Sequence, residues 1–312
     1  MGSTVVSINT YSSALAAARE VASSQHYPHG ALYVVATPIG NLADISLRAL
    51  HVLNLAESIA CEDTRHSQAL LRAFGIEKTS SQMLGVHQHN EAEASITVID
   101  RLRQGQRVAY VSDAGTPGIS DPGARLAAAV RAQGIQIIPV PGASSVTALL
   151  SVAGVLADGS DALGFLFAGF LPGRVMQRME FVSALEKETR CVVVLEAPHR
   201  IESAALTLAQ LGDRNITIGR ELTKQFEEIA TIHASDFPAW LAHSPSRLRG
   251  EFALAIHPAE KATVAGGDHK VLRLLLTELP LKTAVRLAAE ITGESKNGLY
   301  DVALALKAET NP

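Results

Sequence analysis

The chain has 312 residues, 47% of them hydrophobic, which is enough for about two or three domains with sizeable cores. A formal net charge of −4 excludes a basic surface over the whole molecule, although RNA binding needs only a local group of cations. Cys61 and Cys191 lie in apolar stretches and are typical of buried thiols in a reducing compartment. With no membrane-spanning stretch and no secretory signal, we expect a cytoplasmic protein that does not bind a membrane.

Residues 1–30 predict a loosely held extension that contains one alanine-rich helix, at 14–22. From residue 31 onward, apolar stretches that predict strands alternate with helical stretches; the strands are expected at 31–36, 58–61, 108–111 and 136–140. This alternation is typical of a largely parallel sheet with helices on both faces. The loops after the strands should therefore share one edge of the sheet: 37–41, 62–65, 112–120 and 141–145.

The stretch 108–123 is the most informative part of the sequence. An apolar strand leads into a polar loop with three glycines and two prolines, and Asp121 and Pro122 are typical of a helix N-cap and first helical residue. Open α/β sheets bind their ligands where such loops leave the strands. The sequence therefore predicts a ligand site at 112–120.

A linker is expected at 154–160, and 165–170 begins a second α/β unit with further strands at 191–195, at 215–219, near Ile229 and at 251–256. A flexible hinge is expected at 262–268, and beyond it the chain is predicted to be helical, with the layout of a helix-turn-helix. The predicted organisation is an N-terminal extension (1–30), two α/β domains (31–153 and 154–260) and a helical, RNA-binding-like domain (268–312).

Several familiar sites are absent from the sequence. No G-x-G-x-x-G follows the first strand, there is no P-loop, and cysteines and histidines never cluster at metal-ligand spacing, so we expect no metal site. Glu62, Asp63 and Arg65 follow a predicted strand and form either a functional cluster or a local helix cap with its own ion pair. His87 and His89 flank Gln88 and are either a functional pair or surface groups.

Ten short motifs occur together and in order: 37–42, 62–65, 87–91, 112–123, 141–145, 170–172, 196–200, 220–224, 250–251 and 295–297. In this combination the chain, over roughly residues 31–308, resembles the small-subunit ribosomal RNA methyltransferases of the tetrapyrrole methylase superfamily. The resemblance implies two α/β domains with a cofactor cleft between them, S-adenosyl-L-methionine as cofactor, and a homodimer. It also implies transfer of a methyl group to the ribose 2′-hydroxyl of a cytidine in the decoding region of 16S rRNA, in the small ribosomal subunit.

The resemblance also implies which residues meet the cofactor. They belong to the first Gly/Pro loop, the central loop, a pair of serines, the start of the second domain's loop and a late strand: Pro38, Ile39, Gly40, Ser112, Asp113, Ala114, Thr116, Ser144, Ser145, Leu195, Glu196, Ala197, Gly250 and Glu251.

A ribose hydroxyl is a poor nucleophile, so a nearby base should accelerate the transfer by roughly 100- to 10,000-fold. The candidates for this base are Glu62, Asp63, His87 and Asp113, with Lys224 or Arg65 stabilising developing charge; the sequence does not rank them. RNA contacts are expected from polar or cationic residues beside the cleft and on the helical tail: His89, Arg174, Arg178, Arg200, Arg286, Lys296 and Asn297.

Two alternative functions remain open at this point. One is methylation of a corrin or porphyrin precursor, against which the helical tail and the 62–65 cluster argue. The other is a non-catalytic RNA-binding assembly factor that keeps a cofactor fold.

Overall fold

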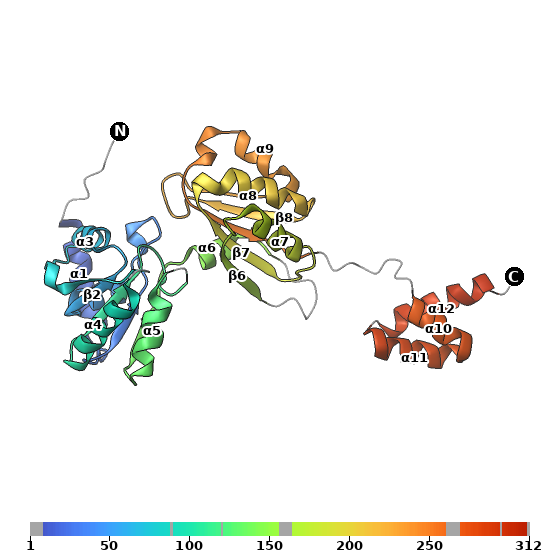
Figure 1. Ribbon diagram of the computed structural model, residues 1–312, viewed down its shortest axis with the longest axis horizontal. Helices are drawn as coiled ribbons and strands as arrows, with labels where there is room; N and C mark the ends of the chain where they lie inside the picture. The colour runs from blue at the N-terminus through green and yellow to red at the C-terminus, as the bar shows by residue number, and fades with distance from the viewer. Residues whose placement is uncertain are drawn as a thin grey trace. The chain divides into compact units, whose positions relative to one another are not determined.

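Five parallel strands form the first sheet of the protein, which we describe from a computed structural model (Figure 1). The strand order is β3-β2-β4-β1-β5, with β1 (Leu32–Val35), β2 (Ser58–Cys61), β3 (Met83–Gly85), β4 (Val108–Val111) and β5 (Ile137–Val140). Four of these strands are predicted from their apolar stretches, whereas β3 is not, because it is only three residues long and half-buried. All pairings are parallel, so the loops after the strands leave the same edge, as predicted.

The structure describes residues 9–87, 90–119, 121–155, 164–259, 269–293 and 295–310, and it divides into two units, 1–259 and 260–312. Both sheets belong to the first unit. Most of the linker predicted at 154–160 and all of the hinge predicted at 262–268 lie outside the described residues.

Helices cover both faces of the first sheet. On one face, α2 (Leu47–Leu55) and α3 (Thr64–Ala73) bury Leu50, Leu53 and Leu71 against the strands. On the other, α4 (Glu91–Arg103) and α5 (Gly123–Ala132) bury Val98 and Leu126. A strand buried on both faces reads as a continuous apolar run, which is why these strands are recognisable in the sequence.

The N-terminal segment is not a loose extension, and that prediction is wrong for the residues described. Helix α1 (Asn9–Ala22) packs against α2, and its Ala18 is completely buried in the core of the first sheet. Small alanine side chains let the two helices approach closely, a packing role that an alanine-rich sequence does not announce by itself.

The second sheet is mixed, in the order β6-β7-β10-β8-β9. Its strands are β6 (Phe165–Phe170), β7 (Cys191–Glu196), β8 (Asn215–Arg220), β9 (Glu228–His233) and β10 (Phe252–Ile256). The last strand in the chain, β10, lies between β7 and β8 and runs antiparallel to both. One face is covered by α7 (Val175–Leu185), α8 (Ile201–Leu208) and α9 (Phe237–Ala242).

The other face of the second sheet is covered by α6 (Ser145–Val152), which follows directly from the first sheet and lies between the two sheets (Figure 1). Leu149 of α6 is fully buried among Val193, Ala253 and Ala255 of the second sheet. The N-terminus of α6 thus lies at the loop edge of the first sheet, and the rest of the helix packs in the core of the second sheet.

The second unit consists of three helices, α10 (Lys270–Glu278), α11 (Leu281–Thr292) and α12 (Lys296–Thr310). They share a small core that includes Leu272, Val285 and Leu299. Gly293 ends α11 in the left-handed conformation, at φ 74°, which glycine adopts without strain. Within the described residues, no helix has the length and apolar character needed to cross a membrane.

Candidate active site

Three contacts join the loops at the shared edge of the first sheet. Thr37 and Gly115 exchange backbone hydrogen bonds of 2.9 and 3.1 Å. The Thr116 hydroxyl donates to the Ala143 carbonyl at 2.9 Å, and His66 Nε2 lies 3.1 Å from the Asp113 carbonyl oxygen. The loops after β1, β2, β4 and β5 therefore meet around the central loop.

The central loop is organised by the carboxylate of Asp121. It accepts hydrogen bonds from the backbone N–H of Gly118 (2.6 Å), the N–H of Gly123 (2.8 Å) and the hydroxyl of buried Tyr110 (3.0 Å). The helix begins one residue later than predicted, at Gly123, with Pro122 at the N-cap. The Asp121 side chain still accepts from the Gly123 N–H at the start of this helix. The predicted capping role of Asp121 is therefore correct, although the helix starts one residue later.

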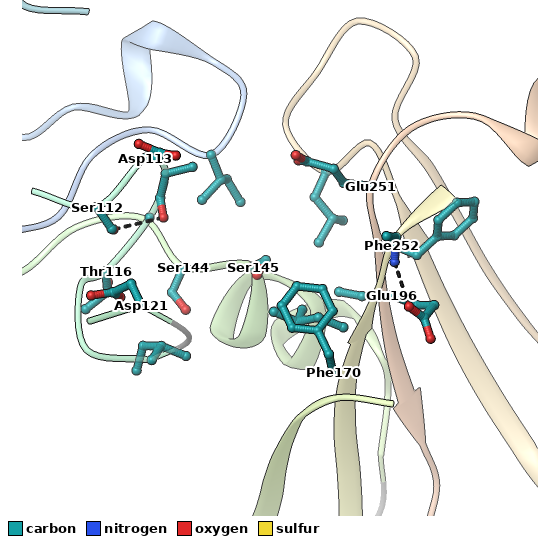
Figure 2. A pocket seen from close by; sticks show the side chains of 18 of the residues that line it. Ser112, Asp113, Thr116, Asp121, Ser144, Ser145, Phe170, Glu196, Glu251 and Phe252 are labelled. Carbon is teal, nitrogen blue, oxygen red and sulfur yellow. Dashed lines mark hydrogen bonds between the residues drawn. The ribbon is translucent and has the colours of Figure 1, made fainter. Parts of the chain in front are cut away.

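A cavity of about 390 Å³ opens between this loop edge and the ends of the second sheet's strands. Figure 2 shows Asp113, Thr116 and Asp121 on one side and Glu251 on the other. Its described lining combines polar loop residues with an apolar wall that includes Phe170, Leu222 and Phe252. Such a mixture of apolar walls and a few polar groups is typical of a small-molecule site.

Of the candidate bases, Glu62 and Asp113 line the cavity, whereas Asp63 and His87 do not. Burial raises the pKa of Glu62 to about 7, with the negative charges of Asp113 and Asp121 adding to the effect. A carboxyl group with this pKa exchanges its proton near neutral pH, which is what a general base requires.

Asp63 caps a helix instead, and Arg65 is exposed beside it. The Asp63 carboxylate caps α3 by accepting from the N–H groups of Arg65 (2.8 Å) and His66 (3.3 Å), and these bonds lower its pKa. Arg65 is 92% exposed and pairs with Asp63 at 3.5 Å. This is the local cap that the sequence left open as an alternative, and the structure does not support a catalytic role for Asp63.

Lys224 does not line the cavity but lies between two carboxylates. Its Nζ is 2.8 Å from Glu221 and 3.1 Å from Glu251, so its charge is largely neutralised. The turn that carries Lys224 also contacts the first Gly/Pro loop, because the Asn41 N–H donates to the Thr223 hydroxyl at 3.1 Å. Lys224 thus contacts Glu251 and lies close to Gly40, and its catalytic role stays a prediction.

Arg178 and Arg200 both have partners inside the protein, and for Arg178 the predicted RNA contact is wrong. Arg178 is 4% exposed, and its Nε donates to Thr207, so it is not available to RNA. Arg200 lies 3.1 Å from the buried carboxylate of Glu196 and donates to the Leu171 carbonyl. Both arginines follow a motif at a strand end, and the sequence does not reveal that they turn inward.

The structure brings most of the predicted cofactor residues together. All line the cavity except Pro38, Gly40 and Gly250, which lie in adjacent turns. The cofactor role itself stays a prediction. The sequence prediction missed further lining residues, namely Gly115, Ile119, Asp121, Phe170, Pro198, Gly219, Leu222, Phe252 and Ala253. Asp121 and Phe170 lie in motifs that the sequence analysis identified and could have been predicted. The lining residues on β8 and β10 could not, because their position depends on the strand order.

The remaining predicted residues of the first unit that the structure describes do not line the cavity. His87 is exposed after β3, and His89 lies outside the described residues. Arg174 is exposed at the start of α7. In the helical unit, Lys296 and Asn297 are exposed at the start of α12, and Arg286 is exposed and pairs with Glu290 at 3.3 Å. No group of metal-ligating side chains occurs among the described residues.

Comparison with known proteins first defines the class. The family profile described as Tetrapyrrole (Corrin/Porphyrin) Methylases matches residues 31–237. Solved structures with a similar fold include diphthine synthase (TM-score 0.55, 14% identity, 73% of this chain and 90% of that one). Another is the cobalt precorrin-4 methyltransferase (TM-score 0.52, 19% identity, 74% and 98%). The fold is therefore that of the tetrapyrrole methylases.

Curated relatives narrow the class further. Proteins named ribosomal RNA small subunit methyltransferase I are 43% identical in Neisseria meningitidis serogroup B (89% of this chain, 94% of the relative) and in Pseudomonas aeruginosa (88% and 97%). The Escherichia coli O157:H7 relative is 42% identical (88% and 95%). A profile described as the RsmI C-terminal HTH domain matches residues 268–307. The chain belongs to the ribosomal RNA small subunit methyltransferase I family.

Proposed function

We propose that this protein is an S-adenosyl-L-methionine-dependent methyltransferase that acts on the ribose 2′-hydroxyl of a cytidine in the decoding region of 16S rRNA. The family membership supports rRNA as the substrate class. The observation that supports catalysis most directly is the cavity at the loop edge, which has Glu62 in its wall. An assembly factor without catalytic activity would not need a carboxyl with a raised pKa beside a ligand-sized cavity.

The cavity fits the proposed cofactor in size and in chemistry. Its volume of about 390 Å³ falls in the range of roughly 300–1,000 Å³ found for small-molecule sites. The central loop, from Ser112 to Thr116, would hold the amino acid portion through backbone groups, and Ser144 and Ser145 lie beside it. Leu195, Ala197 and Phe252 would form the wall on the side of the second sheet. When bound, the cofactor would supply a methyl group on a positively charged sulfonium.

Glu62 is the proposed general base. Its carboxylate would accept the proton of the ribose hydroxyl as that oxygen attacks the methyl carbon in line with the departing sulfur. Orientation of two reactants in one cleft can lower the activation barrier by about 7–11 kcal/mol. The cavity walls would therefore contribute much of the rate enhancement by positioning alone. Proton acceptance by Glu62 would add the roughly 100- to 10,000-fold typical of a general base.

RNA would be held by exposed cations outside the cavity, because the described cavity lining contains carboxylates but no lysine, arginine or histidine. Arg65 and Arg174 are exposed on the first unit. Arg286, Lys296 and Asn297 are exposed on the helical unit and would contact phosphate or ribose groups. We also propose that the protein acts as a homodimer in the cytoplasm, as its resemblance implies.

The test is transfer of labelled methyl groups from S-adenosyl-L-methionine to small ribosomal subunits, to free 16S rRNA and to a uroporphyrinogen acceptor. We expect label in the rRNA, recovered as 2′-O-methylcytidine after digestion to nucleosides. The Glu62→Gln variant, which keeps the size and polarity of the side chain, should lose most of the rate.

The outcomes separate the alternatives. Label only on the tetrapyrrole would replace the proposed acceptor. Donor binding without transfer to any acceptor would favour a non-catalytic factor, and label on a base rather than a ribose would correct the position.

A further inference from the structure

The walls of the cavity differ in charge. Five of its lining residues carry carboxyl groups. On the side of the second sheet, Glu196 is paired with Arg200 at 3.1 Å, and Glu251 is paired with Lys224 at 3.1 Å. Each lining carboxylate on that side therefore has a cation as a direct partner, although Lys224 is shared with Glu221.

The opposite wall has no such balance among the described residues. Glu62 follows β2, and the charges that act on it are the carboxylates Asp113 and Asp121 from the loop after β4. Asp121 receives hydrogen bonds but no cation. Two other titratable groups that interact with Glu62 are Tyr110 of β4 and Cys61 of β2, both buried and with raised pKa values, so both are neutral. On α3, the imidazole of His66 contacts the backbone carbonyl of Asp113 at 3.1 Å and not its carboxylate.

The nearest cation along the chain does not change this picture. Arg65, three residues beyond Glu62, has a side chain that is 92% exposed and pairs with Asp63 at the start of α3. Among the described residues, the wall formed by Glu62, Asp113 and Asp121 thus brings together three carboxyl groups without an ion-paired cation, and burial, with this repulsion added, favours a proton on Glu62.

We propose that Glu62 gives up this proton when a sulfonium donor binds, so that the wall holds either the proton or the donor's positive charge, and the base becomes active only in the donor complex. This rests on the proposed function and adds a regulation of the same site.

The charges balance through the whole reaction. In the donor complex, an ionised Glu62 faces the sulfonium. During transfer, the bond between sulfur and the methyl carbon breaks and leaves its electron pair on sulfur. The acceptor oxygen forms the new bond to carbon, and Glu62 takes the hydroxyl proton. Both charges disappear together, which leaves a protonated Glu62 beside a neutral thioether. The free protein then keeps that proton until the next donor displaces it into solvent.

The experiment is isothermal titration calorimetry of the full-length protein with S-adenosyl-L-methionine and, separately, with its thioether product, S-adenosylhomocysteine. Titrations at pH 7 in buffers of different ionisation enthalpy give the number of protons released per ligand. Burial raises the pKa of Glu62 in the free protein to about 7, so a fraction of the Glu62 groups is protonated at this pH. We expect a fraction of a proton to be released with the donor, decreasing as the pH is raised, and much less with the product.

Variants isolate the group responsible. Glu62→Gln should bind the donor without this release, and subtracting its proton count removes protons that come from the donor's own amino group. Asp63→Asn is the matched control, because it changes a neighbouring carboxyl group that caps α3 outside the cavity, and asparagine also caps helices. Its proton release should equal that of the unaltered protein.

Each result decides something. Equal proton release with donor and product, or unchanged release in Glu62→Gln, would overturn the proposal while leaving the proposed function in place. Proton release without rRNA methylation would support this inference and refute rRNA as the methyl acceptor. A protein that binds neither ligand would refute both proposals. The comparison of the two ligands needs no variant, so it holds even if Glu62→Gln fails to fold.

Discussion

His66 connects α3 to the central loop through Asp113. Its Nε2 lies 3.1 Å from the Asp113 carbonyl oxygen, which can only accept, so the imidazole donates. The backbone N–H of His66 also donates to the Asp63 carboxylate, which caps the start of α3. The helix that follows Glu62 therefore also holds the loop whose carboxylates raise the pKa of Glu62.

Replacing His66 should loosen that loop. We expect His66→Ala to weaken donor binding by about 2- to 10-fold, the effect of losing one hydrogen bond to a backbone carbonyl. His66→Gln is the control, because its amide nitrogen can take the place of Nε2 and should recover most of the affinity. Calorimetric titration measures both, and equal affinities in all three proteins would show that the contact does not position Asp113.

The pH dependence of the proposed reaction follows from Glu62. Its pKa in the free protein is raised to about 7, so the carboxyl is protonated and inactive as a base below that pH and ionised above it. The kcat/KM for the donor should therefore rise with pH through about 7 and then level off. At saturating donor, the rise in kcat should lie at lower pH, because the sulfonium favours the ionised carboxylate. A profile in Glu62→Gln with the same inflection would assign it to another group.

Tyr110 should contribute to both stability and binding. Its buried hydroxyl donates to Asp121 at 3.0 Å, and Asp121 lines the cavity. We expect Tyr110→Phe to lower the free energy of unfolding by about 1.5–3 kcal/mol, as for a bond to a charged acceptor, and to weaken donor binding. Tyr33→Phe removes a 2.9 Å bond to the neutral Pro28 carbonyl and should affect stability alone. Denaturant unfolding and calorimetry distinguish the two effects.

Gly40 is required by a close approach between the first Gly/Pro loop and the turn after β8. A Cβ atom there would lie 2.4 Å from Lys224 Cγ and 3.0 Å from the Leu222 carbonyl oxygen. Gly40→Ala should therefore displace that turn and with it Leu222 and Glu251 of the cavity wall, which lowers donor affinity several-fold. Gly173→Ala, where the nearest atom is 4.0 Å away, is the control and should bind normally.

Removal of residues 260–312 should separate the two tasks of the protein. The cavity lies entirely within residues 1–259, so donor binding should persist. Methylation of ribosomal subunits should be lost if the helical unit supplies RNA contacts. Full activity of the shortened protein would assign recognition to the first unit alone.

The first sheet was largely predictable from the sequence, because strands buried on both faces leave continuous apolar runs. The loop edge followed from the parallel topology, and Thr37 and Gly115 do meet there. The insertion of β10 between β7 and β8 was not predictable, because strand order depends on long-range pairing. The cavity wall that includes Gly219 and Ala253 was missed for this reason.

The charged residues in the sequence predicted functional sites less well than the apolar stretches predicted strands. Arg178 and Arg65 both follow a strand end by a few residues, yet one is 4% exposed and the other has a side chain that is 92% exposed. Arg178 turns inward to Thr207 of α8, and its charge also acts on the buried Glu196. Glu62 and Asp63 are adjacent in the sequence and differ in role because one lines the cavity and the other caps a helix.

The inward turn of Arg178 and Arg200 has a consequence for how a polyanion is gripped. With these guanidinium groups paired with Thr207 and Glu196, the proposed RNA contacts are left to single exposed side chains: Arg65 and Arg174 of the first unit, and Arg286 and Lys296 of the helical unit. Several weak contacts add up only on a partner that engages more than one of them at once. A short oligonucleotide carrying the target nucleotide should therefore be a much poorer substrate than a folded ribosomal particle.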